Sequence, residues 1–353
     1  MAIRKRKKMP PSLTPTGALN KQAAKMVAAA EQAVSSLRNK MFGDMYLHAI
    51  RQHVSGNSVP LKFLKELREI PVSIETFIDS PDFFGATDLV LWPEVRKAIV
   101  DINSRWWKGP KDAYTEVVLM GATSTGKSEI AKVTTAYHIY LLGCMKAPQQ
   151  YYGLPQATSI VFMIQAAKTH VTKKVIYMPL RNYIETMPWF QRHMRPDRLL
   201  EAEMYFPELN VRVVQGGADS DTVLGEAIIG GIIDEINFMN VVTKSKKAAI
   251  GTGRSGTYDQ AQSVYDTITR RRKGRFLSLG PQIGTICVAS STRYKGDFTD
   301  RRKQHVEDNK IKTVYIYDRA QYDVWPQDRY SGEKFRLLVA NESAIDIRIL
   351  VIL

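Results

Sequence analysis

Short apolar runs alternate with amphipathic segments along most of this chain. The apolar runs occupy residues 117–120, 159–164, 211–214, 227–233 and 283–288. Runs of this length are typical of strands that are buried on both faces of a parallel sheet. The segments between them, such as residues 130–141, carry apolar residues at the spacing that is typical of helices. The alternation predicts an α/β fold in which helices flank a mostly parallel central sheet.

The first 80 residues have a different pattern. Basic residues at positions 4–8 are followed closely by prolines, so we expect residues 1–15 to form a flexible basic arm. An alanine-rich amphipathic pattern predicts a small helical N-terminal lobe over residues 16–80. We assign residues 81–345 to the α/β domain, and we expect the apolar residues 346–353 to be a truncated or exposed tail.

One glycine-rich loop connects a predicted strand to a predicted helix. Its residues are Gly121, Ala122, Thr123, Ser124, Thr125, Gly126, Lys127 and Ser128. This is the G-x-x-x-x-G-K-S order of a phosphate-binding P-loop, in which backbone N–H groups surround phosphate oxygens. We expect Lys127 to contact the β- and γ-phosphates of ATP and Ser128 to bind Mg²⁺. A glycine turn without a ligand is the alternative interpretation.

A second motif lies at the end of the apolar run 227–233. Asp234 and Glu235 follow this run directly. P-loop ATPases place such a strand beside the phosphate loop, and its first carboxylate lies where Mg²⁺ binds. We therefore expect Asp234 to hold the water shell of the ion and Glu235 to orient and polarise the attacking water.

Two further stretches are candidates for the nucleotide site. Trp92 lies upstream of the P-loop, where an aromatic ring could stack on adenine or could simply belong to the core. Ser290, Ser291 and Thr292 follow the apolar run 283–288. These hydroxyls either sense the γ-phosphate or form a turn without a role.

The charge of the chain narrows the class of partner. The chain has 353 residues, a formal net charge of +15 and a pI near 9.6. This excess favours a polyanionic partner, with nucleic acid first and an anionic membrane surface second, and solubility alone as the alternative. Only two cysteines occur, so we expect neither a disulfide framework nor a thiolate metal site. No run approaches the ~20 apolar residues of a membrane span, and we expect a cytoplasmic protein.

Residues 243–275 hold much of this positive charge. They could face the DNA backbone, a neighbouring subunit's nucleotide or solvent alone. The P-loop has no arginine at positions 122–125, so further positive charge for γ-phosphoryl transfer has to come from elsewhere. Arg254 lies between glycines within the basic stretch, and it is our candidate for a catalytic arginine supplied to a neighbouring subunit.

Together these pieces resemble the ATPase domain of the large terminase subunit of tailed bacteriophages. The pieces are residues 91–93, the P-loop, residues 224–225 leading into residues 232–235, and residues 290–292, so the resemblance covers roughly residues 80–340. It implies a P-loop NTPase that uses ATP and Mg²⁺ to translocate double-stranded DNA into a procapsid as a homo-oligomeric ring. The implied partners are DNA, the small terminase subunit and the portal, in the host cytoplasm and without a membrane. By position, Glu235 is the catalytic carboxylate and residues 290–292 are the coupling motif.

The chain departs from the pattern of this family in two places. Where the family commonly has a glutamine that brackets adenine, this chain has Glu94, which can accept a hydrogen bond from the adenine amino group but cannot donate one. Full-length members also carry a C-terminal nuclease domain with clustered acidic residues. Asp318, Asp323 and Asp346 are scattered, so we expect no nuclease activity from this chain.

Two other functions compete with the packaging motor. A helicase-like DNA-dependent ATPase shares some of the motifs, but it would normally need a second motor lobe, for which the residues after 312 are too few. A nucleotide-gated DNA-binding assembly component would use ATP only to control assembly and would have no need of Glu235. DNA-stimulated turnover of ATP separates the motor from the gate.

Overall fold

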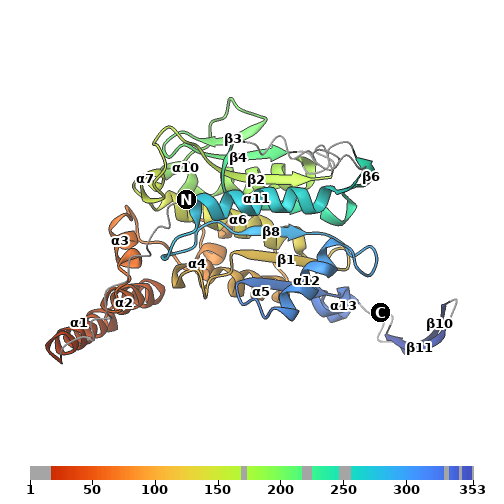
Figure 1. The fold of residues 1–353 in the computed structure, drawn as a ribbon, viewed down its shortest axis with the longest axis horizontal. Coiled ribbons are helices and arrows are strands. Elements are labelled where there is room, and N and C mark those ends of the chain that lie inside the picture. Colours follow the sequence, from red (N-terminus) through yellow and green to blue (C-terminus); the bar gives the residue numbers. More distant parts are fainter. Residues whose placement is uncertain are drawn as a thin grey trace, which may run out of the picture.

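A seven-stranded sheet forms the centre of the molecule. The computed structural model describes residues 17–167, 173–216, 225–245, 256–329, 334–341 and 344–351. The strands of the sheet are β1 (Glu116–Gly121), β2 (Ile160–Ala166), β3 (Glu203–Phe206), β4 (Val211–Gly216), β5 (Ala227–Asp234), β8 (Ile286–Ala289) and β9 (Val314–Arg319). Their order is β3-β4-β2-β5-β8-β1-β9, and every neighbouring pair is parallel except β3 with β4 (Figure 1). The prediction of a mostly parallel central sheet is confirmed.

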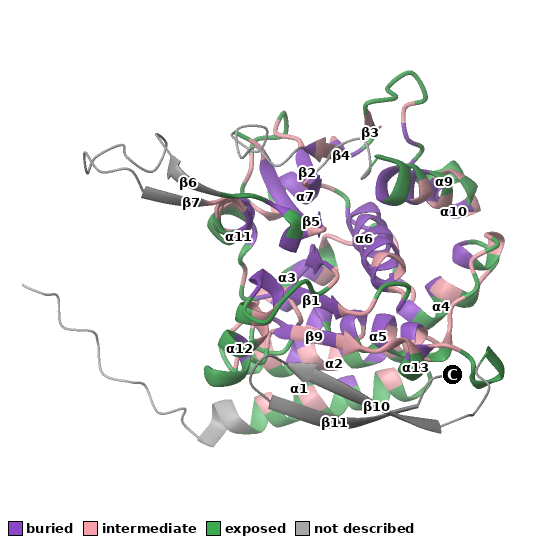
Figure 2. Cartoon of the chain, turned by 90° about the vertical axis from the view of Figure 1, so that its right-hand side faces the viewer, coloured by how far each residue is buried: buried purple, intermediate pink, exposed green. Residues whose placement is uncertain are grey.

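Helices cover both faces of this sheet. The α-helices of the described residues are α1 (Gly17–Ser35), α2 (Lys40–Val54), α3 (Val59–Lys65), α4 (Ile74–Asp79), α5 (Pro93–Asn103), α6 (Lys127–Gly143), α7 (Pro148–Tyr151), α9 (Met178–Thr186), α10 (Pro188–His193), α11 (Gln260–Phe276), α12 (Phe298–Asp308) and α13 (Gln321–Val324). Figure 2 shows α11 and α12 on one side of the strands and α5, α6 and α9 on the other. Helices α1 to α4 precede the sheet and form the predicted helical lobe.

Two antiparallel hairpins complete the described part of the chain. Strand β6 (Val241–Ser245) pairs with β7 (Gly256–Asp259), and β10 (Lys334–Asn341) pairs with β11 (Ala344–Val351). The predicted domain boundary after residue 345 therefore falls inside β11. Most of the predicted tail belongs to that strand.

The apolar runs of the sequence are explained by the layers. Every residue of β2 and β5 is buried, because neighbouring strands and helices cover both faces of these strands. Helix α6 is buried on nearly all sides as well, and its Tyr137 and Tyr140 pack with Phe77 in an aromatic cluster. Its buried polar residues, such as Lys132 and His138, have ion-pair or hydrogen-bond partners, as burial of such groups requires.

The strand order decides which motifs meet. Strand β8 lies between β5 and β1, so the strand that ends in Asp234 does not pair with the P-loop strand. The three strands are parallel, and their carboxyl ends lie at one edge of the sheet. Residues 290–292 follow β8 and are therefore placed between the P-loop and Asp234.

The start of β8 is tied to helices on both faces. The N–H of Gly284 donates to Nδ1 of His138 at 3.0 Å, and Nε2 of His138 lies 3.0 Å from Oγ1 of Thr285. The Arg272 guanidinium donates to the Gly284 carbonyl at 2.7 and 2.9 Å. Arg272 belongs to the basic stretch that we expected to face a partner or solvent, but it is buried and has a structural role. Burial, together with the charge of Arg272, lowers the pKa of His138 to about 3.

Gly231 in β5 cannot be replaced by a larger residue. Its φ is +142°, and a Cβ atom there would overlap the carbonyl oxygen of Met163 on β2. We expect Gly231→Ala to lower the free energy of unfolding by about 3 kcal/mol or more, because the buried backbone cannot move aside. Urea unfolding measures this change.

Gly274 provides the matched control for this prediction. A Cβ atom at Gly274 in α11 would meet nothing within 4 Å, and its φ is not in the left-handed region. Gly274→Ala should leave stability unchanged or raise it by up to about 1 kcal/mol, because alanine favours the helix. Equal effects of the two substitutions would contradict the assigned backbone of β5.

Candidate nucleotide site

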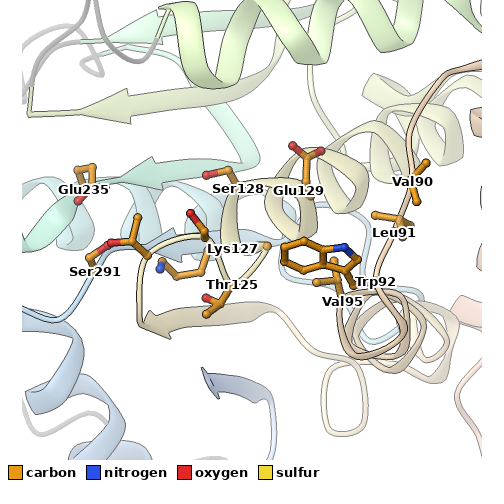
Figure 3. Close-up of a pocket in the computed structure, with 13 residues that line it drawn as sticks. Val90, Leu91, Trp92, Val95, Thr125, Lys127, Ser128, Glu129, Glu235 and Ser291 are labelled. Atoms are coloured by element: carbon orange, nitrogen blue, oxygen red, sulfur yellow. The ribbon is translucent and has the colours of Figure 1, made fainter. Parts of the chain in front are cut away.

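A cavity of about 340 Å³ lies over the carboxyl edge of the sheet. It is lined by Val90, Leu91, Trp92, Val95, Thr123, Ser124, Thr125, Gly126, Lys127, Ser128, Glu129, Glu235 and Ser291. Figure 3 shows Glu235 and Ser291 at one end of this cavity, Lys127 and Ser128 in the middle, and Val90, Leu91 and Trp92 at the other end. Polar and charged side chains therefore occupy one end, and apolar side chains occupy the other.

The P-loop has the backbone that its glycines predict. Gly121 and Gly126 have φ values of +100° and +82°, and Ser124 between them has a φ of +61°. A Cβ atom at Gly126 would overlap Val95 on α5, and one at Gly121 would overlap the carbonyl oxygen of Arg319. Glycine is required at both positions, because the conformation and the space each exclude a side chain.

The Lys127 side chain points into the loop. Its ammonium donates hydrogen bonds to the carbonyl oxygens of Ala122 and Gly121. Burial lowers the pKa of Lys127, and the negative charges of Glu235 and Asp234 oppose this shift. The lysine therefore stands between the loop that precedes it and the acidic pair, where it can neutralise added negative charge. Gly121 and Ala122 take part through these carbonyls and do not line the cavity itself.

Asp234 and Glu235 have different surroundings. Asp234 is 7% exposed, and burial together with the charge of Glu235 raises its pKa to about 6. Glu235 lines the cavity and has a left-handed backbone, with φ +50° and ψ +40°. Left-handed backbone is uncommon outside glycine and is often found at functional sites. The turn at Glu235 directs the chain away from β5 immediately after the acidic pair.

The three predicted hydroxyl residues lie in three different environments. Ser290 is buried, and its hydroxyl donates to Oε2 of Glu235 at 3.4 Å. Ser291 lines the cavity, whereas Thr292 is exposed. The structure thus brings Ser290 and Ser291 to the acidic pair and leaves Thr292 outside.

The apolar end of the cavity is built by the segment before α5. Trp92 lines it and packs edge-to-face against Trp325, with ring centroids 6.0 Å apart. Glu94 does not line the cavity, and its Oε2 lies 3.8 Å from Nε of Arg319. The structure places Trp92 where a base could stack, but it does not bring Glu94 there.

The sequence gives no sign of the side chains that hold the outer side of the P-loop. Tyr317 donates through its hydroxyl to the carbonyl of Thr125 at 2.8 Å, and Trp325 Nε1 donates to the carbonyl of Ser124 at 2.8 Å. Gln321 Nε2 donates to the carbonyl of Thr123 at 3.0 Å. These bonds satisfy loop carbonyls, so that the loop N–H groups can face the cavity. No spacing in the sequence marks these three residues as neighbours of the loop.

The predicted catalytic arginine is not part of the described structure. Arg254 lies outside the described residues, and so does Leu224 of the motif before β5. Among the described residues, no arginine lines the cavity. The role of Arg254 stays a prediction.

The available donors suit Mg²⁺. Ser128 lines the cavity with a hydroxyl oxygen, and Asp234 supplies a carboxylate whose raised pKa reflects burial beside Glu235. In the described part of the chain, no group of three or more His, Cys, Asp or Glu residues could enclose a metal ion. Mg²⁺ typically binds one or two protein oxygens together with phosphates and water, so these residues fit the ion.

This geometry agrees with a comparison of the sequence with protein families. A family model described as "Uncharacterized protein MJ0330, N-terminal P-loop domain" matches residues 42–337. The chain belongs to this family. The matched residues of the P-loop domain include the whole seven-stranded sheet and the cavity. No curated protein matches the chain.

Solved structures with a similar fold are large terminases of bacteriophages. The HK97 large terminase is 14% identical, with a TM-score of 0.45, over 69% of this P-loop chain and 43% of the terminase. The large terminase of a thermophilic bacteriophage is 10% identical, with a TM-score of 0.41, over 65% and 46% of the two chains. The ATPase domain of the Thermus phage P74-26 large terminase is 12% identical, with a TM-score of 0.36, over 66% and 83%.

The chain spans less than half of the length of the first two of these terminases. In the described residues, no helix is both long and apolar enough to cross a membrane.

Proposed function

We propose that this P-loop domain hydrolyses ATP with Mg²⁺ and is the ATPase of a motor that packages double-stranded DNA into a viral procapsid. The proposal is supported above all by one observation, the cavity that the P-loop shares with Glu235 and Ser291. A site that only binds nucleotide has no need of a carboxylate opposite the phosphate loop. The motif set that resembles large terminases and the net charge of +15 support the choice of DNA.

In this proposal each residue has a separate task. The loop N–H groups and Lys127 neutralise the phosphates, and Trp92 supports the base. Glu235 orients a water molecule and accepts its proton as the water oxygen bonds to the γ-phosphorus and the bond to the bridging oxygen breaks. Mg²⁺, held by Ser128 and Asp234, would supply charge neutralisation of the phosphates. The products are ADP and phosphate.

The proposed partners follow from the same reading. Double-stranded DNA is the translocated substrate, and the small terminase subunit and the portal of the procapsid are the assembly partners. The motor assembles as a homo-oligomeric ring in the host cytoplasm, and Arg254 of one subunit completes the site of the next.

Turnover of ATP in the presence of DNA tests this proposal. We expect double-stranded DNA to increase the rate of ATP hydrolysis and to bind without sequence preference. Because Lys and Arg side chains would neutralise phosphates, affinity should fall by about 10³-fold between ~50 and ~200 mM salt. Fluorescence anisotropy with two duplexes of unrelated sequence measures this dependence.

Three outcomes would contradict the proposal in different ways. Absence of ATP hydrolysis would show that the chain is not an ATPase. Hydrolysis of ATP at a rate that DNA does not change would favour a nucleotide-gated component. Affinity for DNA that stays constant as salt rises would exclude recognition through the phosphate backbone.

A further inference from the structure

A single buried amide lies at the junction of the acidic pair, the hydroxyl residues and α12. Asn237 stands two residues after Glu235, in the 3₁₀ turn η5 (Ile236–Phe238), and it is 6% exposed. We propose that Asn237 is a positioning residue for Glu235. Its hydrogen bonds connect the position of the Glu235 carboxylate to the first turn of α12. This inference rests on the proposed hydrolysis of ATP and adds a residue that no motif of the sequence marks.

The polar groups of Asn237 are used completely. Its backbone N–H donates to Ser290 Oγ at 3.2 Å, and its Nδ2 donates to the Ser291 carbonyl at 3.0 Å and to Thr299 Oγ1 at 2.8 Å. Its Oδ1 accepts from the Thr299 N–H at 3.1 Å, and its carbonyl accepts from Arg293 Nη1 at 3.3 Å. A buried amide with all of its hydrogen bonds made has one orientation, because any rotation leaves polar groups unpaired.

Asn237 acts on Glu235 through the segment that carries Ser290 and Ser291, which its side chain holds at the Ser291 carbonyl. The Ser290 hydroxyl accepts from the Asn237 backbone N–H, and its own proton can be donated to Oε2 of Glu235 at 3.4 Å or to the Ser291 carbonyl at 3.3 Å. Glu235 has a left-handed backbone, which persists only where surrounding contacts hold it. The bonds of Asn237 to the Ser290–Ser291 segment supply such contacts on the C-terminal side of the carboxylate.

The same amide reaches the first turn of α12. Asp297 caps this helix by accepting from the Asp300 N–H at 3.0 Å, and it also accepts from the Thr299 hydroxyl at 3.1 Å. Asn237 Oδ1 takes the Thr299 N–H, one of the helix N–H groups that have no partner within α12. A shift of Glu235 therefore moves the end of α12 or breaks the amide contacts.

Helix α12 leads to a basic surface. With α11 it lines a cavity of about 460 Å³ that includes Arg270, Lys273, Arg301 and His305. Side chains of both helices therefore share a surface that can respond when the first turn of α12 is displaced. Asn237 is bonded both to the first turn of this helix and to the segment that carries Ser290 and Ser291.

Asn237→Ala should separate kcat from KM. We expect kcat for ATP to fall at least 10-fold, because Glu235 loses its fixed position, while KM and the affinity for ADP change less than about 3-fold. Asn237→Asp keeps the acceptor for Thr299 and loses both donors, so its kcat should also fall. Unchanged affinity of Asn237→Asp for ADP would show that the variant is folded, so that its lower kcat cannot be explained by failure to fold.

Asn309 offers a matched control at the other end of α12. Its Nδ2 donates to the His305 carbonyl at 2.8 Å, and the residue is exposed. Asn309→Ala should lower stability slightly and leave kcat unchanged. If Asn309→Ala reduced kcat as strongly as Asn237→Ala, general loosening of α12 would explain the effect and the proposal would fail.

A double-mutant cycle identifies the route. Asn237→Ala keeps the backbone N–H that binds Ser290 and removes the side-chain bond to the Ser291 carbonyl. If this side chain acts by fixing the segment that carries Ser290, then Ser290→Ala and Asn237→Ala together should lower kcat by less than the product of their separate effects. Fully multiplicative effects would overturn the proposed route. Should the unchanged protein hydrolyse no ATP, the proposed function itself is wrong; if it does hydrolyse ATP and Asn237→Ala retains full kcat, only the role of Asn237 is wrong.

Discussion

Replacement of Glu235 by glutamine is expected to lower ATP turnover by about 10²–10⁴-fold and to leave ATP affinity almost unchanged. The carboxylate lines the cavity and can accept a proton from water, whereas glutamine of nearly the same shape cannot. Lys127→Ala should instead remove ATP binding, because the ammonium lies inside the loop, where we expect it to contact phosphate in the ground state. Fluorescent nucleotide binding and steady-state hydrolysis, measured on both variants, separate the two roles.

Glu129 provides a control for the glutamate substitution. It also lines the cavity, but Oε1 pairs with Lys132 at 2.6 Å and Oε2 accepts from Tyr183. Glu129→Gln should therefore retain turnover far better than Glu235→Gln. Equal loss of ATP affinity in Lys127→Ala and Glu235→Gln would contradict the assignment of these two residues.

Acidification should change the stability of two variants in opposite directions. His138 is neutral in the folded chain down to a pKa of about 3, whereas in the unfolded chain it takes up a proton below its ordinary pKa of 6.5. The unfolded state then binds more protons, so this residue lowers the free energy of unfolding as pH falls below 6.5, by about 2 kcal/mol at pH ~5. His138→Gln should remove this loss.

Asp234 acts with the opposite sign. Its folded pKa of about 6 exceeds the ordinary 3.8, so the folded state binds the extra proton between these values. Asp234 therefore raises the free energy of unfolding by about 1 kcal/mol as pH falls to ~5, and Asp234→Asn should remove that gain. Relative to the unchanged chain, His138→Gln should gain stability on acidification and Asp234→Asn should lose it.

Urea unfolding at several pH values, without Mg²⁺ or nucleotide, measures both slopes. The pH dependence decides the test, because a change of shape at either site shifts stability equally at every pH. Two slopes of the same sign would show that the assigned protonation states are wrong. With ATP and Mg²⁺ added, Asp234→Asn should also lose the stabilisation that the ligands give to the unchanged chain.

Much of the fold could be predicted because its signals are local. The P-loop, Asp234–Glu235 and the buried strands each depend on a few consecutive residues, whose backbone conformation or burial restricts the choice of side chain. The prediction was weaker where one position was judged alone. Glu94 has the right place in the order of motifs, yet its side chain faces Arg319 rather than the cavity.

The charge of a residue also predicted its exposure poorly when the residue was judged without its tertiary surroundings. Arg272 lies among arginines and lysines that share one helix, but helical geometry turns it toward the Gly284 carbonyl and turns Arg270 toward solvent. The spacing of these residues can be read from the sequence. The position of the sheet relative to this helix, which decides which of them is buried, cannot.

The sequence by itself determined the phosphate loop, the acidic pair and the layered α/β class, because consecutive residues specify strand, turn and helix through their own conformational preferences. Only the tertiary structure decided that β8 separates β5 from β1, that Tyr317, Gln321 and Trp325 hold the loop carbonyls, and that Asn237 joins Glu235 to α12. The side-chain contacts among these join residues that are 62 to 201 positions apart in the chain. They arise when helices and strands pack, and no local spacing encodes which distant segments become neighbours.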